Sequence, residues 1–173
     1  LTFGLLSPGK GIESVIRAMP RIVEAHPDVL YIVLGATHPH VRRQAGERYR
    51  DSLIRLVDEL GMSKHVRFED RYVDQNELAK YLGLADLYVI PYPNAAQITS
   101  GTLAYAAGAG NAIVSTPFWH AEELLADGRG QLVPFNDGDA AADAIVRLLS
   151  DDAARHAMRR AEQHHARDAS ARR

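Results

Sequence analysis

The sequence contains no cysteine, which excludes disulfides, thiolate metal sites and a cysteine nucleophile. It also lacks an apolar run long enough to cross a bilayer, and no basic segment leads into an apolar stretch at its start. An excess of positive charge is missing too, because 20 Lys and Arg stand against 22 Asp and Glu. We therefore expect no transmembrane segment, no signal peptide and no nucleic-acid partner, in a protein suited to a reducing cytoplasm.

The 173 residues suffice for one globular domain with a buried core and are too few for two independent domains. Hydrophobic residues make up 46% of the chain and charged residues 24%, as in soluble globular proteins. A single domain over residues 1–173 is the expectation.

Short apolar runs alternate with longer segments in which apolar residues recur every three or four positions. Most of the short runs are too apolar to have a solvent-facing side, which is typical of buried parallel strands. The expected strands are residues 1–6, 29–35, 66–69, 87–92, 112–116 and 131–134. Because parallel strands need helical crossovers, this alternation predicts an α/β fold: a Rossmann-like, three-layer α/β/α domain with one six-stranded parallel sheet.

Three details of the expected helices can be checked against a structure. Pro20 lies within the first helix and should kink it or end it early. Asp74 and Glu77 have the spacing of a capping box and should begin a helix. Residues 156–166 carry only a thin apolar stripe, so that helix needs a packing partner, such as a missing domain.

The first loop of interest covers residues 4–11, which are rich in glycine, contain Lys10 and lead into a helix. In open parallel sheets, ligands bind at the carboxyl ends of the strands, where backbone amides and a cation can hold phosphate. The loop is close to a P-loop, but Gly11 stands where a Ser or Thr would bind magnesium, so magnesium-dependent phosphotransfer is not expected. A tight turn with a solvated lysine is the plainer alternative.

The second loop covers residues 91–102 and ends at Ser100, Gly101 and Thr102, the expected first residues of a helix. Unpaired amides, the positive end of the helix dipole and nearby hydroxyls would form a seat for a diphosphate. Residues 103–110 are nearly all small, so close packing of this helix on the sheet is the alternative explanation.

With these loops in place, the sequence resembles family four of the retaining glycosyltransferases, which have the GT-B fold. Each motif is weak alone, and their common order over residues 4 to 161 carries the resemblance. The motifs are Gly4 with Lys10-Gly11, the strand and glycine at residues 30–35, Ala85-Asp86 with Pro91, Gly110-Asn111-Ala112-Ile113-Val114, and residues 128–134.

The resemblance implies two Rossmann-like domains, with the sugar donor held mainly by the C-terminal one. This chain resembles that C-terminal domain, and the strand at its very start suggests that the natural protein continues on the N-terminal side. The resemblance implies a UDP- or GDP-sugar donor, retention of anomeric configuration, and no cofactor or metal. The acceptor side, and any contact with the inner membrane, would belong to the absent N-terminal domain of a cytoplasmic protein.

By the same resemblance, Lys10 should meet the donor diphosphate and Tyr72 should lie near the base. The candidate donor-binding residues are Gly9, Lys10, Gly11, Gly35, Tyr72, Gln97, Thr99, Ser100, Gly101, Thr102 and Tyr105. Lys10 and Gln97 are also the candidate catalytic residues.

The chain departs from the family at four positions, one of which is Ala112 in place of a proline. Leu5 replaces an arginine, and Gln97 and Tyr105 replace two glutamates near the transferred sugar and the ribose. Gln97 could still bond sugar hydroxyls, and Tyr105 could make one bond or pack on the ribose. The retained glycine, hydroxyls and helix start favour an active variant, with a non-catalytic nucleotide or sugar-phosphate binding module as the alternative.

The eight histidines lack the spacing of a metal site, so we expect none. His120, beside Trp119 after the fifth strand, is either a donor-site residue or simply the start of a helix. The charges between residues 42 and 51 are mixed in sign and predict a solvated helix face.

Overall fold

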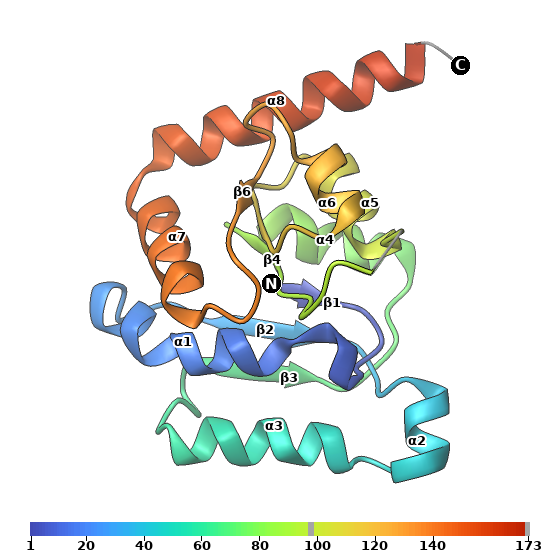
Figure 1. The fold of residues 1–173 in the computed structure, drawn as a ribbon, viewed down its shortest axis with the longest axis vertical. Helices are drawn as coiled ribbons and strands as arrows, with labels where there is room; N and C mark the ends of the chain where they lie inside the picture. Colours follow the sequence, from blue (N-terminus) through green and yellow to red (C-terminus); the bar gives the residue numbers. More distant parts are fainter. Residues whose placement is uncertain (97–98, 172–173) are drawn as a thin grey trace.

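The computed structural model describes residues 1–96 and 99–171, and side chains through residue 161 except at the same gap. Its six short parallel strands confirm the Rossmann-like α/β fold (Figure 1). The strands are β1 (Thr2–Phe3), β2 (Tyr31–Leu34), β3 (Val66–Glu69), β4 (Tyr88–Ile90), β5 (Ile113–Ser115) and β6 (Gln131–Leu132). Each lies inside a predicted segment, and β3 matches its prediction residue for residue.

The prediction of one six-stranded sheet is wrong, because the strands form two three-stranded sheets, β1-β2-β3 and β4-β5-β6. The two sheets meet at the start of β1, where the Leu1 amine donates to Leu87 O and Val89 N–H donates to Leu1 O, both at 2.9 Å. A continued ladder would need an N–H at residue 91, which is proline. Val89 O accepts a 2.7 Å hydrogen bond from the Thr2 hydroxyl, and no further backbone hydrogen bond joins β1 to β4 in the described residues.

The strands therefore follow one another in the spatial order 3-2-1-4-5-6, the Rossmann order, with its switch point between β1 and β4. In the described part of the chain, eight α-helices and a 3-10 turn accompany the strands. They are the turn η1 (Pro8–Lys10) and the helices α1 (Ile12–Ala25), α2 (Pro39–Ala45), α3 (Arg48–Glu59), α4 (Gln75–Leu84), α5 (Gly101–Gly108), α6 (Trp119–Leu124), α7 (Gly138–Ser150) and α8 (Asp152–Ala171). Helices α7 and α8 follow the last strand.

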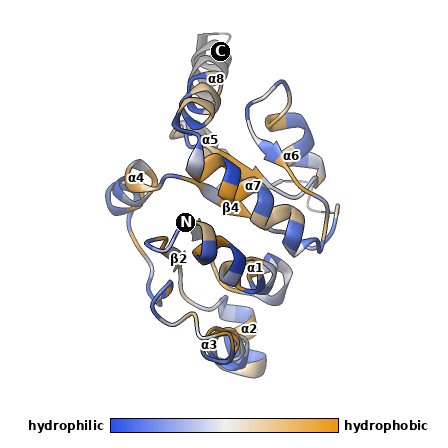
Figure 2. Ribbon diagram, turned by 90° about the vertical axis from the view of Figure 1, so that its left-hand side faces the viewer, coloured by the Kyte–Doolittle hydropathy of each residue, from blue (hydrophilic) through white to orange (hydrophobic). Residues whose placement is uncertain are grey.

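Two buried apolar clusters lie on opposite faces of the strands and confirm the three-layer arrangement. One joins β2 to α1, α3 and α7, and the other joins β4 to α4, α5 and α6. Figure 2 shows the apolar strand β4 between α5 and α7. None of the helices in the described part combines the length and apolarity needed to cross a membrane.

Helix α1 does not end early at Pro20, contrary to that part of the prediction, and continues to Ala25. Pro20 removes one helical hydrogen bond, the one that would reach Ile16 O. Ile16, Met19 and Ile22 are at most 1% exposed, so burial of the stripe around Pro20 holds the helix together.

The predicted start of α4 is confirmed, since Asp74 accepts a 2.8 Å hydrogen bond from Glu77 N–H. Only half of the capping box forms, because the Glu77 carboxylate turns to Arg71.

We expect Asp74→Ala to lower the free energy of unfolding by about 1 kcal/mol, since a helical amide loses its acceptor. Urea unfolding measures this loss, and Asp74→Asn, which keeps the acceptor, is the control. An equal loss in both variants would contradict the capping role.

The weak C-terminal helix finds its packing partners within the domain. In α8, Met158 joins the core at 9% exposure, and Arg155 Nη1 donates to Leu148 O at 2.7 Å. Arg159 Nη2 donates to Ala85 O at 2.6 Å, ahead of β4. The first half of α8 is thus anchored without a second domain.

Candidate functional site

Two glycines bring the loop after β1 against the loop after β4. Gly11 has φ +63°, and a Cβ there would lie 2.0 Å from Pro91 O. A Cβ on Gly4 would lie 3.1 Å from Thr102 Cγ2 at the start of α5. Only residues without a side chain allow this approach. It places η1 beside the start of α5, as the two candidate phosphate loops require.

Lys10, the last residue of η1, is linked to the start of α5 by a tyrosine side chain, Tyr92. Its Nζ donates to Tyr92 Oη at 2.9 Å and lies 4.7 Å from the centre of the Tyr92 ring. Tyr92 is 5% exposed, and its ring packs 4.8 Å from that of Phe118. The only basic residue of either loop is therefore held by a buried aromatic residue.

Tyr92 also joins the hydroxyls of α5. Its Oη lies 3.1 Å from Ser100 Oγ and 3.3 Å from Thr102 Oγ1, and those two oxygens are 3.1 Å apart. Burial would raise the pKa of Tyr92, but hydrogen bonds with Lys10, Ser100 and Thr102 outweigh burial and hold that pKa below its ordinary value. Sequence reasoning did not single out Tyr92; its place between two prolines directly after a buried strand was the available signal.

The start of α5 offers fewer free amides than expected. Ser100 caps the helix by accepting from Leu103 N–H at 3.2 Å, but its own N–H donates to His120 Nδ1 at 2.9 Å. Among the three predicted amides, those of Gly101 and Thr102 have no partner in the described part of the chain. His120, the second residue of α6, therefore lies at this site and holds Ser100, the N-cap residue of α5.

The first loop differs from a phosphate-binding P-loop in how it uses its amides. Lys10 N–H donates to Ser7 O at 3.0 Å, and Gly11 N–H is directed to Pro8 O at 3.4 Å, so both close the turn itself. Of the three candidate amides here, only that of Gly9 has no partner within the described residues. The magnesium-dependent phosphotransferase alternative finds no support in this geometry.

Gly35 lies where the ends of β1 and β2 pack together, and it makes no contact with Lys10 or Tyr92 among the described contacts. It has φ +144°, and a Cβ there would lie 2.0 Å from Gly4 O. Its carbonyl accepts a 2.7 Å hydrogen bond from Arg50 Nη2. The prediction of a solvated face for residues 42–51 is wrong for Arg50, which is 4% exposed and also pairs with Asp70 at 2.7 Å. Arg50 ties together the carboxyl ends of β2 and β3.

The remaining donor-binding candidates lie on α5, ahead of α5, and in the loop before α4. Tyr105 is half exposed, meets the Phe3 ring edge-on, and accepts a 3.2 Å hydrogen bond from Gln75 Nε2. Tyr72, in the preceding loop, is 86% exposed, and Thr99 is exposed. Gln97 lies outside the described residues. Ligand contacts of all four stay predictions.

Arg71 holds the loop that carries Tyr72. Its guanidinium grips the Glu77 carboxylate with both Nη atoms, one of them at 2.9 Å, and reaches Tyr81 Oη at 3.2 Å. The hydrogen bonds from Arg71 lower the pKa of Glu77.

No group of three His, Asp or Glu close enough to hold a metal is found in the described part of the chain.

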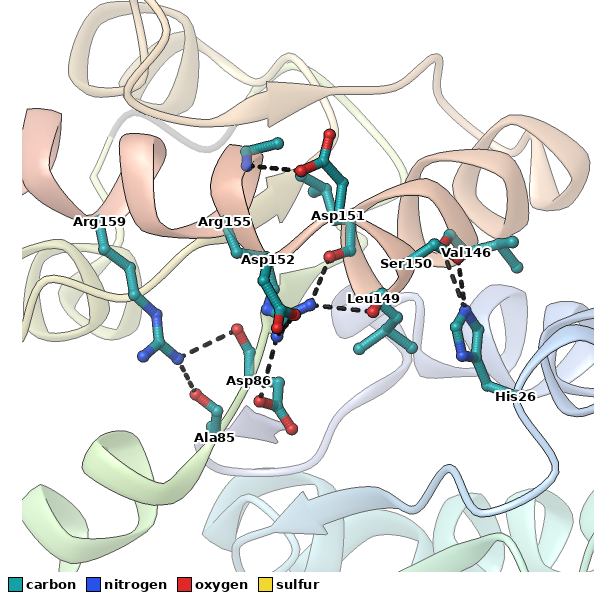
Figure 3. A network of polar contacts seen from close by, with 12 residues as sticks. His26, Ala85, Asp86, Val146, Leu149, Ser150, Asp151, Asp152, Arg155 and Arg159 are labelled. Atoms are coloured by element: carbon teal, nitrogen blue, oxygen red, sulfur yellow. Dashed lines mark hydrogen bonds and ion pairs between the residues drawn. The ribbon is translucent and has the colours of Figure 1, made fainter.

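A cavity of about 600 Å³ lies at the opposite, amino end of the strands, between α1, α4 and α7. Apolar side chains dominate its lining, and its basic side chains, His26 and Arg155, already have partners. Arg155 Nη1 donates to the carbonyls of Leu148 and Leu149, and His26 Nε2 meets Val146 O at 3.2 Å (Figure 3). This cavity offers a diphosphate no free cation.

The chain is similar to known proteins of one family. It matches the family described as glycosyl transferases group 1 over residues 1–165. A phosphatidyl-myo-inositol mannosyltransferase of Mycolicibacterium smegmatis is 31% identical over 147 residues, which are 84% of this chain and 34% of that protein. A GDP-mannose-dependent alpha-(1-6)-phosphatidylinositol monomannoside mannosyltransferase of the same organism is 29% identical over 169 residues, 94% of this chain and 41% of that protein.

Solved structures share the fold. The C-terminal domain of the group 1 family protein LpcC from Francisella tularensis has a TM-score of 0.78 at 23% identity, covering 94% of this chain and 80% of that one. Anabaena HepE in complex with UDP and glucose has a TM-score of 0.81 at 22% identity, covering 95% of this chain and 42% of HepE.

This chain spans 34% to 41% of the length of the two mannosyltransferases. The family match takes in both candidate phosphate loops and all six strands. The chain belongs to the group 1 glycosyltransferases, and its fold is that of one half of a GT-B enzyme.

Proposed function

We propose that this chain binds a nucleoside diphosphate sugar at the carboxyl end of its strands and forms the donor-binding part of a retaining hexosyltransferase. The observation that carries the proposal is the meeting of Lys10 with the start of α5 at the switch point between β1 and β4. There, one ammonium group, the Ser100 and Thr102 hydroxyls, and two amides that have no partner among the described residues lie together. A diphosphate needs this combination of positive charge and hydrogen-bond donors.

In this role the diphosphate lies between Lys10 and the amides of Gly101 and Thr102. During transfer, the bond between the sugar and the diphosphate breaks, and negative charge grows on the leaving phosphate oxygen. Donors already in place stabilise that charge without reorganising, which is how such sites lower a barrier. The half-exposed Tyr105 ring is available to the ribose, and Tyr72 to the base. Gln97 and Thr99 complete the proposed donor site.

The relatives support a nucleotide-sugar donor without fixing its base. One mannosyltransferase relative is named for GDP-mannose, and HepE was solved with UDP. Since this chain spans 34% of the first relative, we propose that an N-terminal domain supplies the acceptor side. Transfer by this chain alone is not expected, whereas binding is.

Calorimetric titration with UDP-glucose and GDP-mannose, with and without EDTA, tests the proposal. We expect saturable binding of at least one donor, unchanged by EDTA. A folded sample that binds neither donor would overturn the proposed function.

A second candidate is a non-catalytic nucleotide or sugar-phosphate binding module, motivated by Gln97 and Tyr105 in place of two glutamates. Tyr105 favours it further, because its hydroxyl already accepts a hydrogen bond from Gln75. A longer polypeptide that includes the N-terminal domain distinguishes the two. Release of UDP or GDP from the donor, lost on Lys10→Ala, supports the transferase, and binding without any release supports the module.

A further inference from the structure

Lys10 is the sole basic residue in both loops of the proposed site, residues 4–11 and 91–103. A lysine is a point charge on a four-carbon stem with many rotamers, and fixing it on a ligand costs conformational entropy. A site that depends on one lysine gains from a group that fixes the ammonium before the ligand arrives. In this chain the group in contact with the ammonium is the Tyr92 hydroxyl, at 2.9 Å.

We propose that Tyr92 is the positioning residue of Lys10. In the free protein it holds the Lys10 ammonium beside the start of α5, so the ammonium is already in place when a diphosphate binds. The inference deepens the proposed function and rests on it for the ligand, but the ordering of Lys10 stands on the free structure alone.

Tyr92 can serve as an anchor because other contacts fix it. Its ring packs on Phe118, its carbonyl accepts a 2.7 Å hydrogen bond from Thr116 Oγ1, and its hydroxyl touches Ser100 Oγ and Thr102 Oγ1. Lys10 contributes none of these contacts. The anchor therefore keeps its place whether or not Lys10 is present.

The geometry also leaves Lys10 able to bind. An ammonium has three N–H donors, and the described contacts use one of them, on Tyr92 Oη. The ring face 4.7 Å from Nζ adds attraction without using a donor. Two N–H groups stay available for phosphate oxygens. The reduced pKa of Tyr92 agrees with a hydroxyl oxygen that faces positive charge.

The first test is a double-mutant cycle on UDP and GDP affinity, using whichever nucleotide the wild-type chain binds. We expect Tyr92→Phe to weaken binding about 10-fold, which corresponds to one hydrogen bond to a charged group. The double variant with Lys10→Ala should bind no more weakly than Lys10→Ala alone, because Tyr92 acts through Lys10. Unchanged affinity in Tyr92→Phe, or independent losses that multiply, would overturn the proposal.

Tyr31→Phe is the matched control, since it also removes a buried tyrosine hydroxyl bonded to a side-chain hydroxyl, that of Thr2 at 2.8 Å. It lies at the amino end of β2, so UDP affinity should stay at the wild-type value. A loss there equal to that of Tyr92→Phe would show a general effect of buried hydroxyls and would contradict positioning.

The second test is made on the free protein and needs no ligand. In a ¹H–¹⁵N NMR spectrum of the lysine ammonium groups, Lys10 in the free wild-type protein should give an ordered signal that Lys64 and Lys80 lack, and Tyr92→Phe should abolish it. A Lys10 signal as averaged as the other two would overturn the proposal. If neither UDP nor GDP binds, the proposed function fails, and this spectrum still decides whether Tyr92 orders Lys10.

Discussion

Lys10→Ala should weaken the binding of UDP- or GDP-sugars by about 10- to 100-fold, as expected for the loss of hydrogen bonds to a charged group. The alanine removes the one lysine of the two loops, and neither loop contains a second basic residue to take its place. The Gly101 and Thr102 amides remain, so binding should weaken rather than vanish. Calorimetric titration of both proteins measures the ratio.

Lys64→Ala is the control for this prediction. It makes the same change in net charge, but residue 64 lies between α3 and β3, at the amino end of the strands. Its affinity for the donor should equal that of the wild type. Equal weakening in both variants would mean that overall charge, rather than Lys10, governs binding.

Gly35→Ala should lower the free energy of unfolding by about 3–5 kcal/mol, a loss that many domains cannot survive. The cause is twofold. At φ +144° an alanine is strained, and its Cβ would lie 2.0 Å from Gly4 O. Gly4 cannot retreat freely, because its N–H donates to Leu34 O at 2.9 Å within the strand pairing. Urea unfolding, or the soluble yield if the variant does not fold, measures the effect.

Gly46→Ala separates strain from steric clash. Gly46 has φ +61°, but nothing lies within 4 Å of a Cβ at that position. Its ψ of −135° lies outside the left-handed helical region, so Gly46→Ala should lose about 1–3 kcal/mol from backbone strain alone. If both variants lost the same amount, the close approach of Gly35 to Gly4 would not be what the fold depends on.

The sequence predicted the strands well because burial on both faces leaves continuous apolar runs, as at residues 29–35 around β2. It did not predict the break between the two sheets. That break depends on which strands become neighbours, since Pro91 interrupts pairing only because β4 lies beside β1. Local pattern alone gives no strand order.

Charge and helix patterns failed where tertiary contacts decide. Arg50 occurs in a run of mixed charges that resembles a solvent-exposed face, yet Gly35 O and Asp70 draw it into the interior. Pro20 would end an isolated helix, but the buried stripe around it holds α1 to Ala25. Both outcomes need partners that lie far away in the sequence.

The candidate site was predictable in its main parts and not in its detail. Lys10 and residues 100–102 follow strands whose carboxyl ends must meet, so their proximity followed from the fold class. Two contacts could not be read from the chain: Tyr92 on Lys10, and His120 on the Ser100 amide. Each joins segments whose spacing along the chain, 82 and 20 residues, carries no pattern.

We expect a nucleotide sugar to bind at the carboxyl end of the strands rather than in the amino-end cavity. An amide-resolved ¹H–¹⁵N NMR titration with UDP and with GDP tests it most directly. The largest shifts are expected at Gly9, Gly101, Thr102 and Tyr105, and the signals of Leu30, Asp86 and Leu149 around the cavity should not move. Shifts concentrated at the cavity, or none with either nucleotide, would contradict it.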